Sequence, residues 1–314
     1  MPTEPKRNRA PEPLLRVFIA ALLLLQGVAL AEMPMDPGRL GWTRLEMKAV
    51  NPVGEVTVEV RLEKGAGNDG LRLPEAGGSP VIEPGERKIL RLDMDIRASF
   101  LLKRKQWRGG AWVLQGNGAA LQRVRLKAGR SGSYKRYRYA ERGVYRLRSE
   151  PKGRRESRLP PERWSRARHA YYPLAPAAEG CEMVSDPLAL LYLIPASGLL
   201  AGGERTFCIF NKHDVYRVTL VAAGLEPVRV GYPDPAAGAD AGQGPRNIQG
   251  RRVRLTARPL DPGNRNLDPF EFIGLEGDVE FVFDPATGIP LLVRGVLPGA
   301  GESELRLVRA ELAP

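Results

Sequence analysis

The chain has 314 residues, a formal net charge of +12 and only two cysteines and two histidines. So few cysteines and histidines exclude a disulfide-dense scaffold and leave too few ligands for a histidine-based zinc centre. Gly and Pro number 35 and 28, about a fifth of the chain, against roughly 12% in average proteins. Such a composition favours short strands joined by many turns over long helices.

The first segment of the chain has the layout of a secretory signal peptide. Basic residues precede an apolar run from Val17 to Ala31, which ends in the small-x-small pattern Ala29-Leu30-Ala31. The run is shorter than the roughly 20 residues that a membrane-spanning helix needs. We therefore predict that residues 1–31 are removed on export and that residues 32–314 form a single β-rich domain, soluble in the periplasm. An uncleaved membrane anchor is the alternative.

Apolar and polar residues alternate with a period of two along much of the remaining chain, which indicates β-strands. The predicted strands are 54–62, 87–96, 122–127, 136–139, 145–148, 205–211, 214–222, 226–232 and 251–258, with three more between 278 and 312. Residues 149–162 and 233–247 are polar or rich in Pro, Gly and Ala, which predicts loops. We expect the second of these loops to be flexible.

One compact apolar segment interrupts the strands, CEMVSDPLALLYLI at Cys181–Ile194. Ser185 or Asp186 suits a helix N-cap, Pro187 suits the first turn, and Pro195 is expected to end the helix. Leu188, Leu191 and Tyr192 would then share one face. A helix of roughly ten residues is marginal by itself and needs a sheet to pack against. These patterns together predict a mainly β fold, in which a curved antiparallel sheet, or half-barrel, clasps a short helix at about 186–194.

The two cysteines, Cys181 and Cys208, allow one intramolecular pairing. Because an exported protein meets an oxidising compartment, we predict a disulfide between them. Two buried free thiols are the alternative.

Several of these residues resemble an uncharacterised family of exported Gram-negative proteins. The resemblance is carried by Asp186-Pro187-Leu188 followed by Leu191-Tyr192, then by GLLAGGERTFCIFN and VYRVTLVAAGLEPVRV within 198–230. It implies a half-barrel akin to the LolA/LolB lipoprotein carriers, and no assigned activity. The tryptophan usual in that family's C-terminal strand is absent, because EFVFD stands there.

The middle of the chain is strongly basic. Between residues 101 and 170 there are 21 Lys or Arg and 4 Glu. The cations alternate with Val, Leu and Tyr, so we expect them to line one face of the sheet and to bind an anionic ligand. The candidate binding residues are Arg123, Arg125, Lys127, Arg136, Arg138, Arg146 and Arg148. A solvated face that only maintains solubility is the alternative, whereas export argues against nucleic acid as a partner.

The sequence contains no motif of a known catalytic or metal site. Gly65–Gly70 matches G-x-G-x-x-G, but no helix follows it to face a pyrophosphate, which predicts a hairpin loop. His169 is expected in a basic loop and His213 beside a turn. We predict no catalytic residue, no metal and no cofactor. The predicted function is a non-enzymatic envelope protein that binds or carries an amphiphilic or anionic component, such as a lipid, lipopolysaccharide or a lipoprotein. A membrane surface is the other partner that the basic and aromatic residues suggest. The alternatives are an enzyme acting on envelope polysaccharide or peptidoglycan, and an assembly scaffold.

Overall fold

A computed structural model describes ten stretches of the chain, which are 35–51, 54–68, 70–72, 79–100, 103–129, 131–174, 181, 183–232, 246–261 and 268–313. The predicted signal peptide, 1–31, lies outside them. So do residues 233–245 of the predicted flexible loop, whereas its last two residues, Arg246 and Asn247, begin a strand.

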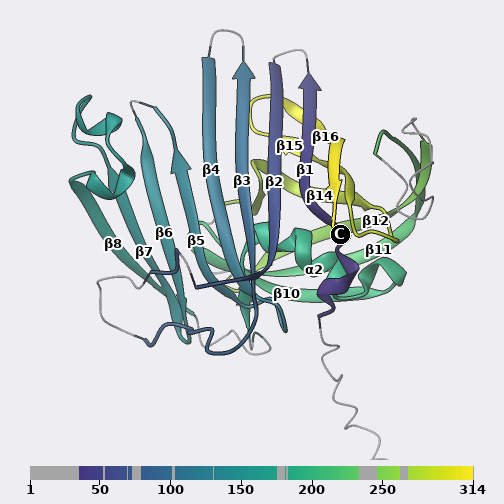
Figure 1. Cartoon of the computed structure of the whole chain (residues 1–314), viewed down its shortest axis with the longest axis horizontal. Helices are drawn as coiled ribbons and strands as arrows, with labels where there is room; N and C mark the ends of the chain where they lie inside the picture. The colour runs from purple at the N-terminus through teal and green to yellow at the C-terminus, as the bar shows by residue number, and fades with distance from the viewer. Residues whose placement is uncertain are drawn as a thin grey trace, which may run out of the picture. The chain divides into compact units, whose positions relative to one another are not determined.

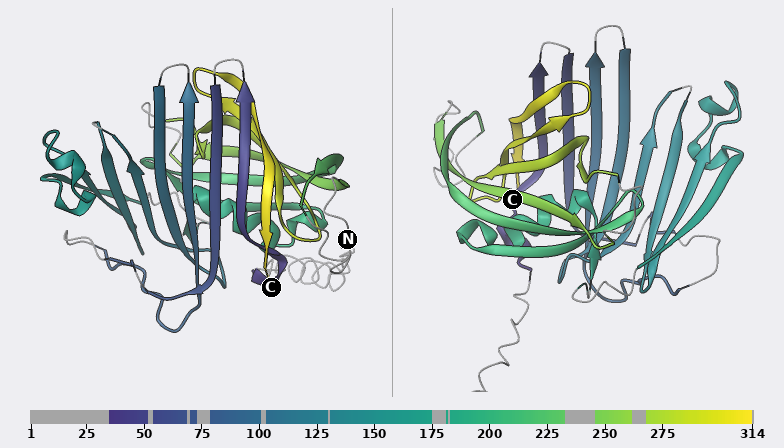
Figure 2. Two further views of the ribbon diagram at one scale, coloured as in Figure 1. Left: turned by 45° about the horizontal axis from the view of Figure 1, so that its top comes forward. Right: turned by 180° about the vertical axis from the view of Figure 1, so that it is seen from behind.

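The described residues form one large sheet that curves but does not close (Figures 1 and 2). Its strands are β1 (Trp42–Asn51), β2 (Gly54–Ala66), β3 (Ile89–Phe100), β4 (Lys103–Leu114), β5 (Ala120–Lys127), β6 (Ser133–Ala140), β7 (Gly143–Glu150), β8 (Arg166–Pro173), β9 (Val184–Ser185), β10 (Glu204–Asn211), β11 (Asp214–Val230), β12 (Arg246–Pro259), β13 (Glu271–Phe272), β14 (Leu275–Phe283), β15 (Pro290–Leu297) and β16 (Gly301–Leu312). Five short 3-10 turns accompany them, η1 (Pro37–Arg39), η2 (Glu156–Arg158), η3 (Pro161–Arg163), η4 (Pro187–Ala189) and η5 (Leu199–Ala201). The predicted mainly β class with a curved antiparallel sheet is confirmed.

The strand order makes two arms from the two halves of the chain. The sheet runs from β8 back to β1, then from β16 back through β14 and β12 to β9, while β13 pairs only with β14. β1 and β16 are therefore hydrogen-bonded neighbours in the middle of the sheet, and β8 and β9 are its free edges. All pairings are antiparallel except the short one between β9 and β10. We call β1–β8 the first arm and β9–β16 the second arm.

The alternation that predicted the strands matches their burial. In β2, Val56, Val58, Val60 and Leu62 are buried, and most of the residues between them are not. These side chains belong to one core cluster with residues of both arms and of the short helix. One face of the sheet thus points inward, as expected for antiparallel strands that are half covered.

The helix forms where it was predicted and is buried on every side. The Asp186 carboxylate accepts a hydrogen bond of 2.9 Å from the Leu188 N–H, so Asp186 is the N-cap of η4. Helix α2 (Leu190–Ala196) follows directly and has no exposed residue. The prediction of a single apolar face was therefore too narrow. Pro195 does not end the helix, because the Ser197 N–H donates to the Leu193 carbonyl and completes the last turn.

Three further contacts, two hydrogen bonds and a disulfide, fix this segment between the arms (Figure 1). The Tyr192 hydroxyl donates to the Gln115 carbonyl, and the Ser185 hydroxyl donates to the Gly118 carbonyl at 2.6 Å. Both acceptors lie in the turn between β4 and β5 of the first arm. On the other side, Cys181 is disulfide-bonded to Cys208 of β10 in the second arm, which confirms the predicted pairing.

Several parts of the two arms differ from the prediction. β1, β4 and β8 were missed, as were the two-residue strands β9 and β13. Gly109-Gly110 interrupts the apolar pattern of β4, and β8 has no buried stripe. In β1 the buried residues alternate from Leu45 to Ala49, so the period-two signal was present there and was overlooked. His169 consequently lies on β8 rather than in a loop. The segments predicted as two strands at 214–222 and 226–232 form the single strand β11, which is irregular between Ala222 and Leu225.

Candidate functional site

The register of β5, β6 and β7 decides which cations share a face. Arg123 lies opposite Tyr137, which lies opposite Arg146. Arg125 lies opposite Lys135, which lies opposite Arg148. Directly opposed residues of an antiparallel pair point to the same side of the sheet. Five of the seven candidates therefore lie on the inner face, namely Arg123, Arg125, Lys127, Arg146 and Arg148.

Arg136 and Arg138 lie on the opposite face, so the expectation of one common face was wrong for these two. Their strand presents Tyr137 and Tyr139 inward, both buried, and its arginines consequently point outward. Arg138 is only 2% exposed, and its guanidinium donates to the carbonyls of Leu121 and Ile82 at 3.0 and 2.9 Å. Arg138 thus holds the chain near residue 82 against the outer face, which is a structural role.

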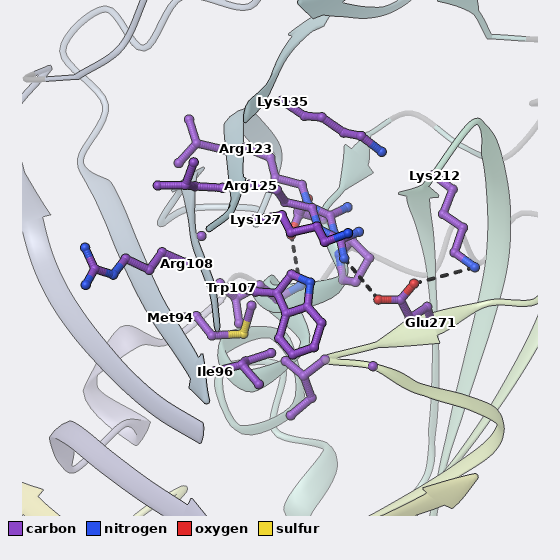
Figure 3. Close-up of a pocket in the computed structure, with 18 of the residues that line it drawn as sticks. Met94, Ile96, Trp107, Arg108, Arg123, Arg125, Lys127, Lys135, Lys212 and Glu271 are labelled. Atoms are coloured by element: carbon purple, nitrogen blue, oxygen red, sulfur yellow. Dashed lines mark hydrogen bonds and ion pairs between the residues drawn. The ribbon is translucent and has the colours of Figure 1, made fainter. Parts of the chain in front are cut away.

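A pocket of about 570 Å³ lies between the arms, over the inner face of β3–β6 (Figure 3). Its first wall comes from the first arm and its second from β13, β14 and the turns after β10 and β15. The apolar side chains that line it include Met94, Ile96, Trp107, Leu188, Ile273 and Leu297. The cations that line it are Lys105, Arg108, Arg123, Arg125, Lys127, Lys135 and Lys212, and the acids are Asp186, Asp268, Glu271 and Glu276.

At the base of the pocket, Asp186 joins the helix cap to the basic strand. Its carboxylate is fully buried, lies 3.4 Å from the Nε of Arg123 and accepts a hydrogen bond of 3.0 Å from the Tyr139 hydroxyl. Burial, reinforced by the negative charge of Asp186, raises the pKa of Tyr139 well above its ordinary value. Tyr139 therefore remains a neutral donor. The Oδ1 of Asp186 caps the helix, and its Oδ2 meets both Tyr139 and Arg123.

Across the pocket, Glu271 bridges the two arms. Its carboxylate lies 3.1 Å from Arg125 of the first arm and 3.5 Å from Lys212 of the second (Figure 3). Burial alone would raise the pKa of Glu271, but the charges of Arg125, Lys212 and Arg123 outweigh it and hold the pKa below its ordinary value. Lys212 also contacts Glu276 at 3.2 Å. Glu271 is therefore ionised and paired with cations of both arms, and Glu276 is paired with Lys212.

Lys135 is a half-buried cation of the pocket that lacks such pairing. Among the described residues, no carboxylate lies within ion-pair distance of its ammonium group. Burial lowers its pKa to about 8, and the charges of Arg125, Arg148, Arg146 and Arg123 add to the effect. Lys105 and Lys127 also have no acidic partner in the described part of the chain. The pocket thus contains positive charge that the protein does not neutralise.

Some of these residues were predicted and others were not. Asp186, Pro187 and Leu188 line the pocket, whereas Leu191 and Tyr192 lie in the core beside it. Lys135, Lys212 and Glu271 were missed. Lys135 and Arg136 are neighbours on β6 and therefore point to opposite faces of the sheet. The sequence shows that only one of them can line the pocket, but it does not show which one. Lys212 and Glu271 belong to the second arm and enter the site only through the tertiary fold.

The described residues contain no group of three or more His, Cys, Asp or Glu arranged to hold a metal ion. Among the helices of the same residues, none has the length and apolarity needed to cross a bilayer. Comparisons with protein-family models, with curated proteins and with solved structures find no match to this chain.

Proposed function

We propose that the pocket between the arms binds an anionic amphiphile, with an acidic head group beside Lys135 and an acyl chain along the apolar lining. The observation that carries this proposal is the surplus of charge in a half-apolar pocket, seven cationic against four acidic side chains. Grouping like charges in a partly desolvated site is unfavourable unless a counter-charge arrives. A bound phosphate or carboxylate would supply it.

The cations with no acidic partner define where the head group would sit. Arg123 and Arg125 are held by Asp186 and Glu271, which leaves Lys105, Lys127 and Lys135. Lys127 and Lys135 lie on the adjacent strands β5 and β6 of the same wall. Lys127 lies opposite Ser133, two residues from Lys135, so both ammonium groups can face one anion. Paired arginines beside them add fixed donors that suit phosphate oxygens.

The apolar part of the pocket suits a hydrocarbon chain. Met94, Ile96 and Trp107 line one side and Ile273 and Leu297 the other. The volume of about 570 Å³ lies within the range of about 300–1,000 Å³ that is usual for small-molecule sites. The predicted export and the disulfide support a setting in the periplasm, where phosphorylated lipids, lipopolysaccharide and acylated proteins offer this chemistry.

Trp107 provides a direct test. It is the partly exposed tryptophan of the pocket, whereas Trp42, Trp112 and Trp164 are buried elsewhere. A brominated lysophosphatidic acid, used below its critical micelle concentration, should quench the fluorescence of Trp107 in a saturable way. A brominated monoacylglycerol of the same chain length should bind at least about 10-fold more weakly, because it lacks the charge. Trp107→Phe should abolish most of the quenching.

Charge variants separate the head-group site from general attraction. Lys135→Met and Lys127→Met should each weaken the anionic probe about 10-fold, in line with the loss of one charge-assisted contact worth about 1.4 kcal/mol. Lys88→Met removes an exposed lysine outside the pocket and should leave the affinity unchanged. Equal quenching by the charged and the neutral probe, or equal effects of all three variants, would contradict the proposal.

The pocket does contain two carboxylates that share a cation, which raises the alternative of glycoside hydrolysis. Glu271 and Glu276 are cross-strand partners, and both contact Lys212. A hydrolase of this kind needs one carboxyl group with a raised pKa as its acid. The pKa of Glu271 is shifted in the opposite direction. This geometry therefore favours ligand binding over hydrolysis.

A further inference from the structure

The connection between β7 and β8, residues 151–165, is exposed and strongly basic. Figures 1 and 2 show it projecting beyond the ends of the two strands, where η2 and η3 lie. Its exposed cations are Lys152, Arg154, Arg155, Arg158 and Arg163. Its only acids are Glu156 and Glu162. The loop therefore presents a net positive surface to its surroundings.

The Glu156 carboxylate makes its hydrogen bonds within the loop and forms no ion pair with the exposed cations, which all lie in the described part of the chain. Its carboxylate accepts hydrogen bonds from the backbone N–H groups of Lys152 and Ser165, at 2.8 and 3.1 Å, and from the Ser165 hydroxyl at 2.7 Å. These backbone donors lower the pKa of Glu156. The carboxylate ties the two ends of the loop together and so gives it a defined shape.

At the centre of the loop an apolar side chain faces solvent. Leu159 is 38% exposed and is followed by Pro160, which is exposed as well. The backbone at Leu159 is fixed on both sides, because its N–H donates to the Glu156 carbonyl and its carbonyl accepts from the Trp164 indole at 3.2 Å. Trp164 is buried and packs against Gly132 in the turn between β5 and β6. An exposed leucine is thus held in place, with cations on either side.

We propose that the loop at 151–165 docks on the surface of a bilayer that contains anionic lipid. The arginines would pair with lipid phosphates, and Leu159 would enter the interface between head groups and acyl chains. A soluble polyanion would satisfy the charges but would give the fixed leucine no apolar contact. For that reason the combination of charge and apolar tip favours a membrane over a glycan or a nucleic acid.

The position of the loop relative to the pocket strengthens this inference. A row of opposed cations, Arg168, Arg148, Lys135 and Arg125, crosses the inner face from β8 to β5. Arg168 is the third residue of β8, which follows the loop directly, and Arg125 and Lys135 line the pocket. Docking through the loop would place this positive track next to the source of an anionic lipid. The proposal goes beyond binding in the pocket and does not depend on it.

Vesicle flotation tests the docking directly. Large unilamellar vesicles of phosphatidylcholine, with or without 30% phosphatidylglycerol, are mixed with the full chain at low salt and at 0.15 M salt. We expect binding to the anionic vesicles only, weakened by salt. Replacing Arg154, Arg155 and Arg158 with Gln should lower the partition coefficient about 100-fold at low salt, since each basic residue near an anionic surface contributes about fivefold. Leu159→Ser should lower it about 10-fold at both salt concentrations.

Matched controls use exposed residues outside the loop. Arg229, Arg258 and Arg309 replaced together with Gln make the same change in net charge on the second arm, and Leu225→Ser removes a leucine that is 51% exposed. Both controls should bind like the unchanged chain. If the control arginines matter equally, binding follows net charge and the proposal is overturned. If Leu159→Ser binds like the unchanged chain, the loop recognises polyanions in general, and the bilayer assignment is overturned. Quenching of Trp107 by the monomeric brominated lipid should persist in every loop variant, which keeps this test separate from that of the pocket.

Discussion

Replacing Asp186 should reveal how much of the fold depends on one buried carboxylate. Asp186 accepts from the Leu188 N–H, from the Tyr139 hydroxyl and from Arg123. Asp186→Ala removes a helix N-cap, worth about 1 kcal/mol, and leaves a buried hydroxyl without its acceptor, which costs about 1–3 kcal/mol. It also leaves Arg123, whose side chain is 12% exposed, without its counter-charge. Removing one partner of a buried pair costs about 3–5 kcal/mol, and the nearby Glu271 offsets part of that.

Because these losses overlap, we expect Asp186→Ala to lower the free energy of unfolding by about 4–6 kcal/mol. For a domain of this size that corresponds to a fall in melting temperature of roughly 10–15 °C. Asp186→Asn keeps one oxygen for the helix cap and puts an amide NH2 where Oδ2 met Tyr139 and Arg123. It should therefore cost less than Asp186→Ala only by the worth of the cap, about 1 kcal/mol. Arg123→Met added to Asp186→Ala should cost little more, since the unpaired charge is then gone.

The assay is denaturation in guanidinium chloride, followed by circular dichroism under oxidising conditions, for the single variants and the double variant. The expected order of stability is the unchanged chain, then Asp186→Asn, then Asp186→Ala. Equal destabilisation by Asp186→Asn and Asp186→Ala would refute a separate contribution of the helix cap, which Asn retains and Ala lacks. Additive costs of Arg123→Met and Asp186→Ala would refute the ion pair as a coupled unit.

Three further predictions concern other parts of the structure. The pKa of Lys135 is lowered to about 8, so the folded chain releases this proton at lower pH than the unfolded chain does. Stability should therefore rise between pH 8 and about 10.5 as an unfavourable charge is lost, and Lys135→Met should flatten this rise in melts recorded across that range. The Cys181–Cys208 bond encloses a segment spanning 27 positions. Reducing it should lower the free energy of unfolding by about 3–4 kcal/mol. An unchanged denaturation midpoint in the double variant Cys181→Ser, Cys208→Ser would contradict this. Gly288→Ala should destabilise the fold by several kcal/mol, because Gly288 has a φ of +65° and a Cβ there would lie 2.4 Å from the Arg39 carbonyl oxygen. The control Gly85→Ala, with a φ of +57° and no atom within 4 Å of the added Cβ, should cost only about 1 kcal/mol. Thermal melts of the two variants measure the difference.

The period-two pattern was sufficient to predict most strands, and the segment at 181–194 was sufficient to predict the helix. Both depend on neighbouring residues in the chain. The wrong predictions concern which face of the sheet a side chain lies on, and alternation along a single strand does not determine that. On β6 both the tyrosines and the arginines alternate, and nothing local decides that Tyr137 points inward and Arg136 outward. That choice follows from packing Tyr137 and Tyr139 against Phe210 of the second arm.

For a similar reason, the sequence predicted only those residues of the candidate site that belong to the first arm and the helix cap. Arg123, Arg125 and Lys127 come from one strand and could be found together. Glu271, which meets Arg125, is 146 residues further along the chain. Its role emerges only once the second arm faces the first.

The pairing of β1 with β16 has a consequence for how the molecule is made. Thr43 and its hydrogen-bond partner Glu311 are 268 residues apart, yet they meet in the middle of the sheet. A ribosome synthesises the chain from its N-terminus and makes β1 long before β16, so one edge of β1 lacks its hydrogen-bond partner until β16 has been made. Contacts of such long range are slow to form, and open edges invite association with other chains. We therefore expect the nascent chain to need a chaperone until β16 is available to pair with β1.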